Sequence, residues 1–260
     1  MMKNKAVVLM SGGMDSAVCT SIAKESGYEL AALHLNYGQR TQKREKKAFD
    51  DLTKYFGINE ILEVNVSYFS QIGASSLTDT NIDIPITNFE LRITNELKTQ
   101  NSKLPTEKSE NGQLITDNEL TTPNSQLETE IPSSYVPFRN GNILAIAASW
   151  AEAIGAIAIF IGAMQLDFSG YPDCRREFFD AFEKAINLGT KPETNIEIVT
   201  PIINLTKKDV VIKGIELGVP FELTWSCYKD EDLACGVCDS CVLRLRGFEQ
   251  AGFKDPIEYK

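Results

Sequence analysis

The sequence predicts an α/β protein that is built around a parallel β-sheet. An apolar run at 6–10 stops at Ser11-Gly12-Gly13, and an amphipathic stretch starts at Asp15. This order is typical of a strand, a tight loop and a helix. A second apolar run at 29–36 follows at a distance that suits a right-handed crossover between two parallel strands.

The other elements continue this alternation of strands and helices. Gly27 ends the first helix, and Thr206 with Asp209 marks the start of a late helix that Gly218 stops. We expect strands at 5–10, 29–36, 61–66, 156–162 and 196–200, and helices at 15–26, 42–56, 143–154, 176–188 and 206–217. We also expect Asn140 or Asn142 to cap the Ala-rich helix.

One apolar stretch, 143–164, is long enough to cross a bilayer. Glu152 lies near its middle, where an ionised carboxylate is costly in a membrane. Gly155 separates an Ala-rich part from a β-branched part, so we expect a buried helix followed by a strand.

The composition excludes several classes of protein. A chain of 260 residues suffices for one large α/β domain, and its net charge of −10 makes it a poor non-specific binder of nucleic acid. The N-terminal sequence lacks the pattern of a signal peptide, so we expect a cytoplasmic protein. Residues 87–130 are rich in Asn, Thr, Ser, Glu and Gln, which predicts a polar, disordered insertion.

The loop after the first strand has the properties of an anion site. Gly12 and Gly13 allow a sharp turn and a close approach of the backbone to a ligand, while Ser11 and Ser16 supply hydroxyl groups. The new helix presents N–H groups and its positive dipole end, which favour phosphate. No Lys follows the glycines, so this is not the phosphate-binding loop of kinases and GTPases.

Two further regions carry polar groups that suit ligand binding. Arg139 precedes a predicted helix, and the loop at 162–176 brings many acidic, basic and aromatic groups after a buried strand. Such a set suits recognition of a flat polar ring, although Ser-Gly and Pro-Asp also favour a simple turn. Lys207, in the first turn of its helix, is either a phosphate ligand or an exposed lysine.

Four cysteines near the C-terminal end have the spacing of metal ligands. Cys227, Cys235, Cys238 and Cys241 follow the pattern C-x7-C-x2-C-x2-C. Four thiolates fit tetrahedral Zn(II) and leave no open position, so we expect a structural zinc. A [4Fe–4S] cluster is the alternative, and disulfides are disfavoured in a cytosolic chain.

Taken together and in order, the motifs SGGMDS, NYGQR, YVPFRN, DFSGYPDCRREF, TWSCY and CGVCDSC resemble those of the 7-cyano-7-deazaguanine synthase family of queuosine biosynthesis. This family is part of the ATP pyrophosphatase (PP-loop) superfamily. The sequence departs from the family pattern at Thr41, where histidine is usual, and at Phe138, where glycine is usual.

The resemblance implies an adenine-nucleotide α-hydrolase-like fold, with a nucleotide-binding α/β domain at 1–220 and a zinc-binding segment at 221–260. It implies that ATP, ammonia and 7-carboxy-7-deazaguanine react through adenylated intermediates to the nitrile, AMP and pyrophosphate. Zn(II) is then structural, and Mg(II) accompanies ATP.

The resemblance also implies three sets of site residues. ATP would contact Met10, Ser11, Gly12, Gly13, Met14, Asp15, Ser16, Ala17, Val18, Cys19 and Thr20, among which Ser11, Asp15 and Ser16 are the catalytic candidates. The deazaguanine would contact Arg139, Asn140, Asp167, Ser169, Tyr171, Asp173 and Arg175. The metal ligands are the four cysteines.

Two other functions stay open. A PP-loop thiolase that modifies tRNA shares the SGGxDS loop, and a non-enzymatic zinc docking module would share the cysteines. We expect no requirement for nucleic acid or a membrane, and we leave a homodimer open.

Overall fold

The computed structural model describes residues 4–86, 131–165 and 170–260. The expectation of disorder at 87–130, and the substrate candidates Asp167 and Ser169, lie outside the described residues. The division of the chain at residue 220 stays a prediction.

The described strands form one parallel sheet. Its strands are β1 (Lys5–Leu9), β2 (Glu29–Asn36), β3 (Glu60–Asn65), β4 (Ala158–Phe160) and β5 (Glu197–Val199), in the order β3-β2-β1-β4-β5. Every neighbouring pair is parallel. The predicted α/β fold with a parallel sheet is therefore confirmed.

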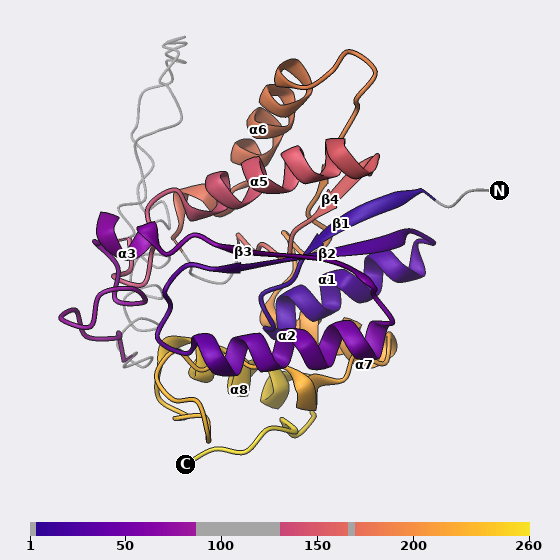
Figure 1. Ribbon diagram of the computed structural model, residues 1–260. Coiled ribbons are helices and arrows are strands. Elements are labelled where there is room, and N and C mark those ends of the chain that lie inside the picture. The colour runs from indigo at the N-terminus through magenta and orange to yellow at the C-terminus, as the bar shows by residue number, and fades with distance from the viewer. Residues whose placement is uncertain (1–3, 87–130, 166–169) are drawn as a thin grey trace, which may run out of the picture. The chain divides into compact units, whose positions relative to one another are not determined.

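Helices cover both faces of this sheet, as Figure 1 shows. The helices are α1 (Met14–Glu25), α2 (Gln42–Phe56), α3 (Tyr68–Ile72), α5 (Arg139–Ile154), α6 (Arg176–Gly189), α7 (Lys207–Glu216) and α8 (Asp239–Ala251). Helices α5 and α6 lie on one face, and α1, α2, α7 and α8 on the other. The sequence interpretation missed α3 and α8.

The burial of β1 on both faces explains its continuous apolar run. Ala6 and Val8 join the core beneath α1 and α7, while Val7 joins the core beneath α5 and α6. A strand that is covered on both faces needs apolar side chains at every position.

The long apolar stretch is divided as expected into α5 and β4, with Gly155 between them in a left-handed conformation. No helix within the described ranges has the length and apolar character needed to cross a membrane.

The start of α5 differs from the expectation. Phe138 is the N-cap, at φ 53°, and no side chain caps the helix, so the predicted caps Asn140 and Asn142 are wrong. Asn140 is instead used in a buried contact with another loop. The Phe138 ring packs over Gly141 and near Phe178 and Phe182, which offsets its unusual backbone conformation. The predicted start of α7 is confirmed, because Thr206 and Asp209 form a capping box.

The strand order reverses between β1 and β4, which makes this the switch point of the sheet. From β1 the chain crosses over to β2 on one side, whereas β4 pairs with the other side of β1. Ligands of open α/β sheets bind beyond the carboxyl ends of the strands at such a switch point. The loop at 10–13 leaves β1 at this place.

The loop passes very close to the backbone of α2 at Gly12. A Cβ atom at Gly12 would lie 2.7 Å from the carbonyl oxygen of Glu45, in the first turn of α2. The Gly12 carbonyl accepts a hydrogen bond of 2.9 Å from the N–H of Trp225. The loop is therefore clamped between α2 and a distant segment of the chain.

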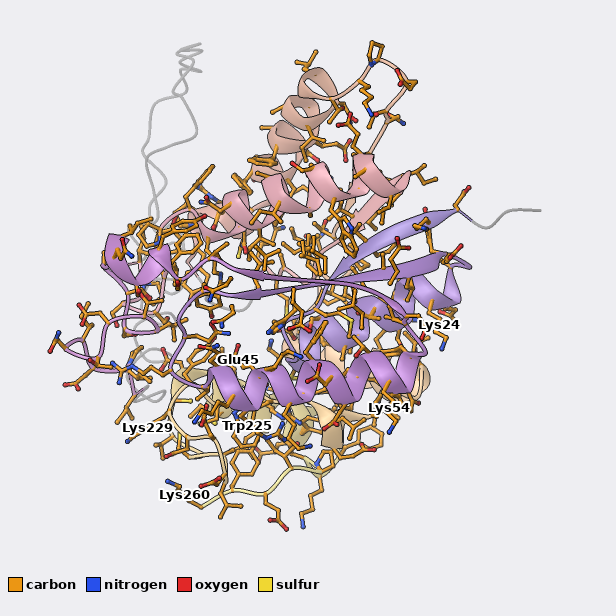
Figure 2. The ribbon with its side chains drawn as sticks, in the orientation of Figure 1. Lys24, Glu45, Lys54, Trp225, Lys229 and Lys260 are labelled. Carbon is orange, nitrogen blue, oxygen red and sulfur yellow. The ribbon has the colours of Figure 1, made fainter. Side chains whose placement is uncertain are left out.

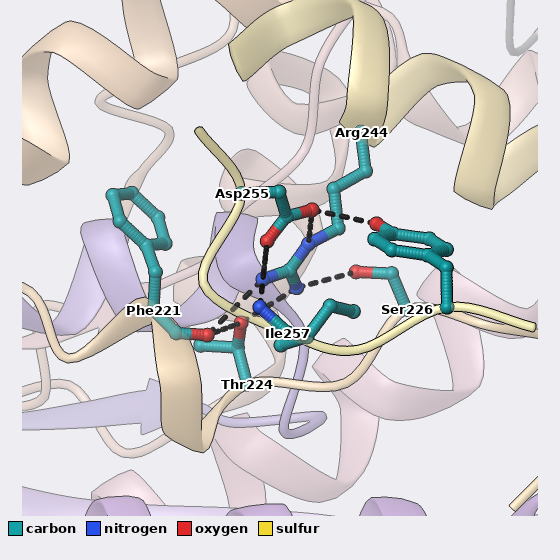
Figure 3. Close-up of polar contacts among 7 residues, drawn as sticks. Phe221, Thr224, Ser226, Arg244, Asp255 and Ile257 are labelled. Carbon is teal, nitrogen blue, oxygen red and sulfur yellow. Dashed lines mark hydrogen bonds and ion pairs between the residues drawn. The ribbon is translucent and has the colours of Figure 1, made fainter. Parts of the chain in front are cut away.

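Arg244 of α8 holds that distant segment (Figure 3). Its guanidinium forms two hydrogen bonds of 2.7 and 2.9 Å with the Asp255 carboxylate, and both side chains are almost wholly buried. It also donates to the Thr224 hydroxyl and to the Phe221 carbonyl. A planar guanidinium with fixed donors can satisfy all of these acceptors together.

We predict that Gly12→Ala destabilises the fold more than Gly27→Ala. Both glycines have nearly the same positive φ, 89° and 87°, so the backbone strain of about 1–2 kcal/mol is shared. A Cβ at Gly27 meets nothing within 4 Å, whereas at Gly12 it strikes the α2 backbone. Chemical denaturation should show a further loss of about 1–3 kcal/mol for Gly12→Ala. Equal losses would mean that the close approach costs nothing.

We predict that Asp255→Ala lowers the free energy of unfolding by about 3–5 kcal/mol, because it leaves the Arg244 guanidinium buried without its counter-charge. Asp50→Ala, which removes an exposed partner of Lys46, is the control and should cost about 0.3–0.5 kcal/mol. Urea denaturation of both variants measures the difference. Similar midpoints for the two would contradict the role given to the buried pair.

Candidate active site

A cavity of about 250 Å³ lies at the carboxyl edge of the sheet. One wall is the loop after β1 and the start of α1, with Met10, Ser11, Gly13, Met14, Asp15 and Ser16. The rest of the lining includes Tyr37, Glu45, Arg139, Asn140, Trp225 and Tyr228. The structure thus brings most of the predicted loop together with the first two predicted substrate residues.

The loop is held in shape by its own serines. Ser16 Oγ donates to the Gly13 carbonyl at 2.8 Å, and Ser11 Oγ accepts from the Gly13 N–H at 3.2 Å. Gly13 caps α1 without a side-chain hydrogen bond. The N–H groups and dipole of the first turn are therefore directed at the cavity, which suits an anion.

The last four predicted ATP residues do not line the cavity. Ala17, Val18, Cys19 and Thr20 are buried along α1. Burial raises the pKa of the Cys19 thiol, so it behaves as an apolar side chain. These residues pack the helix against the sheet behind the loop.

Asp15 forms an ion pair across the cavity wall. Both of its carboxylate oxygens lie 2.9 Å from Lys207 Nζ. The ammonium also lies 3.3 Å from Met164 Sδ, and the side chain is only 14% exposed. Lys207 is therefore not a solvated surface lysine, and its charge lies at the edge of the anion site.

Arg139 places a cation in the lining of the cavity. Its guanidinium lies 5.3 Å from the Tyr37 ring centroid and donates to the Tyr37 hydroxyl at 3.2 Å. Burial opposes the charge, but the neighbouring Tyr37 and Tyr171 hydroxyls raise the pKa of Arg139. For Tyr37, burial raises the pKa to about 12, so this phenol stays neutral beside the cation.

Asn140 ties α5 to the loop that carries Tyr171 and Asp173. The Asn140 N–H donates to Asp173 Oδ2 at 2.8 Å, and its amide donates to the Asp173 carbonyl at 2.9 Å. Burial raises the pKa of Asp173. Tyr171 shares a hydrogen bond of 2.8 Å with Ser134. Arg175 is exposed and bonds back to the Pro172 carbonyl of its own turn.

Glu45 is a cavity residue that the sequence interpretation missed. It lies in the first turn of α2, on the side of the helix that faces the sheet (Figure 2). Thr41 Oγ1 donates to one carboxylate oxygen at 2.8 Å, and Gln39 Nε2 donates to the other at 3.0 Å. Removal from water raises the pKa of Glu45 to about 6, although these hydrogen bonds oppose the shift.

The position of Glu45 along the helix could have identified it as a residue on the buried side of α2. It continues the buried stripe of α2 that contains Phe49, Leu52 and Phe56, at spacings of four, three and four residues. A carboxylate on the apolar side of a helix is unusual and marks a position to inspect.

The four predicted metal ligands converge. Their sulfur atoms all lie within 4.8 Å of one another, and the sulfurs of Cys235 and Cys241 are 3.9 Å apart. The N–H groups of Lys229 and Asp230 point at the Cys227 sulfur. Hydrogen bonds from the Cys238 and Cys241 thiols lower the pKa of Cys227, and the backbone N–H groups of Cys235 and Asp230 lower it further. The cluster could hold a metal ion.

Comparison with known proteins identifies the family. A family model described as queuosine biosynthesis protein QueC matches residues 5–102 and 89–252. A 7-cyano-7-deazaguanine synthase of Chloroherpeton thalassium is 54% identical over 256 residues, which are 98% of this chain and 97% of that protein.

Proteins of the same name from two other organisms are also similar. The protein of Chlorobium phaeobacteroides is 51% identical over 98% of this chain and 97% of its own length. The protein of Sulfurovum sp. is 50% identical over the whole of both chains. The resemblance that the motifs indicated is confirmed. The chain belongs to the QueC family of queuosine biosynthesis proteins.

Proposed function

We propose that this protein is an ATP-dependent ligase that converts 7-carboxy-7-deazaguanine and ammonia into 7-cyano-7-deazaguanine, with release of AMP and pyrophosphate. One observation carries the proposal: a single cavity joins a glycine loop suited to phosphate with the Arg139 cation and Asn140. The name shared by the relatives supports the choice of substrate.

The nucleotide binds along the loop at 10–16 in this proposal. The N–H groups of the first turn of α1 hold the phosphates, while Ser11 and Ser16 add hydroxyl donors. Lys207 balances the charge of Asp15 and of the departing pyrophosphate. Mg(II) would enter with ATP and neutralise phosphate charge, and Asp15 is the loop carboxylate suited to it.

The deazaguanine acid binds beside Arg139 and Asn140 in this proposal. The Arg139 guanidinium can pair with a carboxylate through two parallel hydrogen bonds. Asn140 and Asp173 are joined by hydrogen bonds, and with Tyr171 they supply polar groups that suit the ring edge. Asp167, Ser169 and Arg175 complete the proposed contacts.

Adenylation explains why ATP is needed twice. Ammonia does not displace oxide from a carboxylate, but it displaces AMP from an acyl adenylate, which gives the amide. A second adenylation, at the amide oxygen, turns that oxygen into a leaving group, and its departure with AMP leaves the nitrile. Each oxygen of the carboxylate thus leaves on one AMP.

Free ammonia, and no nucleic acid, serves the reaction in this proposal. The net charge of −10 disfavours a polyanion as partner. None of the six cysteines, all of which lie in the described residues, forms a disulfide, which fits the cytoplasm. We include assembly of two copies of this chain into a homodimer in the proposal.

The metal is proposed to be zinc in a structural role. Four thiolates around tetrahedral Zn(II), at about 2.3 Å each, lie about 3.8 Å apart, close to the 3.9 Å between the Cys235 and Cys241 sulfurs. When bound, the ion would crosslink the segment at 227–241 and take no part in the reaction.

We predict that a mixture of the protein, ATP, Mg(II), ammonium and 7-carboxy-7-deazaguanine yields AMP, pyrophosphate and the nitrile without tRNA. Chromatography and mass spectrometry measure the products. ADP as the product would contradict adenylation. AMP formed only with tRNA and a sulfur donor would favour a thiolase, and no cleavage of ATP would favour a docking module.

We predict one zinc per chain, which Cys238→Ser removes together with several degrees of thermal stability. Cys19→Ser is the matched control, because it changes a buried cysteine of α1 that is not part of the cluster and should retain the metal. Elemental analysis and thermal unfolding give the two readouts. Iron with sulfide, or no metal in the unaltered protein, would overturn the assignment.

A further inference from the structure

We propose that the Glu45 carboxylate is a catalytic base that takes protons from the nitrogen of the incoming ammonia. This inference rests on the proposed function, which requires proton acceptors. Glu45, which lines the cavity, is the proton acceptor that we assign.

The reaction releases every proton that the nitrogen carries. Ammonium must lose one proton to become a nucleophile, and the nitrogen loses a second when the tetrahedral adduct expels AMP to form the amide. The adenylated amide then loses two more as the C≡N bond forms and the second AMP leaves. No oxidant or reductant is needed, but a base must lie beside the nitrogen throughout.

Glu45 lies where such a base is needed. It lines the same cavity as Ser11 of the proposed nucleotide loop and Arg139 of the proposed acid site. Thr41 and Gln39 each donate one hydrogen bond to a different carboxylate oxygen, which fixes the group. A carboxylate has about four lone-pair sites, so each oxygen can still accept a proton or an N–H donor.

The alternatives along the cavity wall are less suited. Among the described residues that line the cavity, the other carboxylate is Asp15, which is neutralised by Lys207 at 2.9 Å. Tyr37 is a neutral phenol that accepts from Arg139. No ion pair of the described chain includes Glu45, so its charge is available to attract ammonium.

The surroundings of Glu45 also favour proton transfer near neutral pH. Withdrawal from water raises its pKa to about 6, which makes it a stronger base than an ordinary carboxylate. Arg139 acts on the same carboxylate electrostatically and lowers its pKa, while Glu231 raises it. Because Arg139 and Glu45 line one cavity, acid held by Arg139 would share that cavity with Glu45.

Glu45→Gln tests the proposal, because it removes the base and keeps the shape of the side chain. The first assay is ATP–pyrophosphate exchange with the acid, which reports adenylation and needs no base at nitrogen. The second is single-turnover amide formation with ammonium. We expect exchange to persist while amide formation falls about 10²–10⁴-fold. The ratio of the two rates does not depend on how much of the variant is folded.

Two further experiments distinguish a role of Glu45 in proton transfer from a role in holding the structure of the site. Hydroxylamine, which is mostly unprotonated at neutral pH, should restore attack on the adenylate in Glu45→Gln and give the hydroxamate. Added formate should restore part of the amide formation in Glu45→Ala. Asp50→Asn, which alters an exposed carboxylate of the same helix, is the control and should match the unaltered protein.

The proposal would be overturned if Glu45→Gln left the ratio of amide formation to ATP–pyrophosphate exchange unchanged. If both rates fell equally, Glu45 would support adenylation or the loop; if neither fell, it would have no role in the reaction. Absence of both activities in the unaltered protein would instead overturn the proposed function itself, so the two failures are distinguishable.

Discussion

The missing side chain at Gly12 is the constraint on which the site depends. The first turn of α2 approaches the loop so closely that its carbonyl oxygen occupies the space of a Cβ atom. On the other side, the N–H of Trp225 donates to the Gly12 carbonyl. Three segments that are far apart in the sequence thus meet at one glycine. A shift of any of them alters the cavity that the loop lines.

The C-terminal part of the chain is therefore part of the site as well as a support. Arg244 fixes Thr224 beside Trp225, and the Arg44 guanidinium stacks 4.4 Å from the Trp225 ring centroid. The cysteine cluster packs against Trp225 and against Ala48 of α2. Loss of order at the cysteines would reach the loop through this tryptophan.

Much of the fold could be predicted from the sequence because its signals are local. Apolar runs between glycines gave the strands, and the capping pair Thr206 and Asp209 gave the start of α7. Helix α8 was missed because it begins inside the cysteine motif at Asp239, where metal spacing dominated the interpretation.

The candidate site was predicted less completely, since it depends on contacts between distant residues. The loop and Arg139 have motifs of their own, whereas Glu45 is one of several charges in a polar helix and gains its meaning only from packing. Asn140 looked like a helix cap, but the loop at 171–174 offered it a buried partner that local rules do not include.

Phe138 has a consequence for how this sequence can vary. A left-handed residue before α5 normally calls for glycine, and here an aromatic ring takes that place by lying over Gly141, where a Cβ would come within 2.3 Å of it. Positions 138 and 141 are therefore linked. A side chain at 141 therefore requires the Phe138 ring to move away or to be replaced, so variation at one position is constrained by the residue at the other.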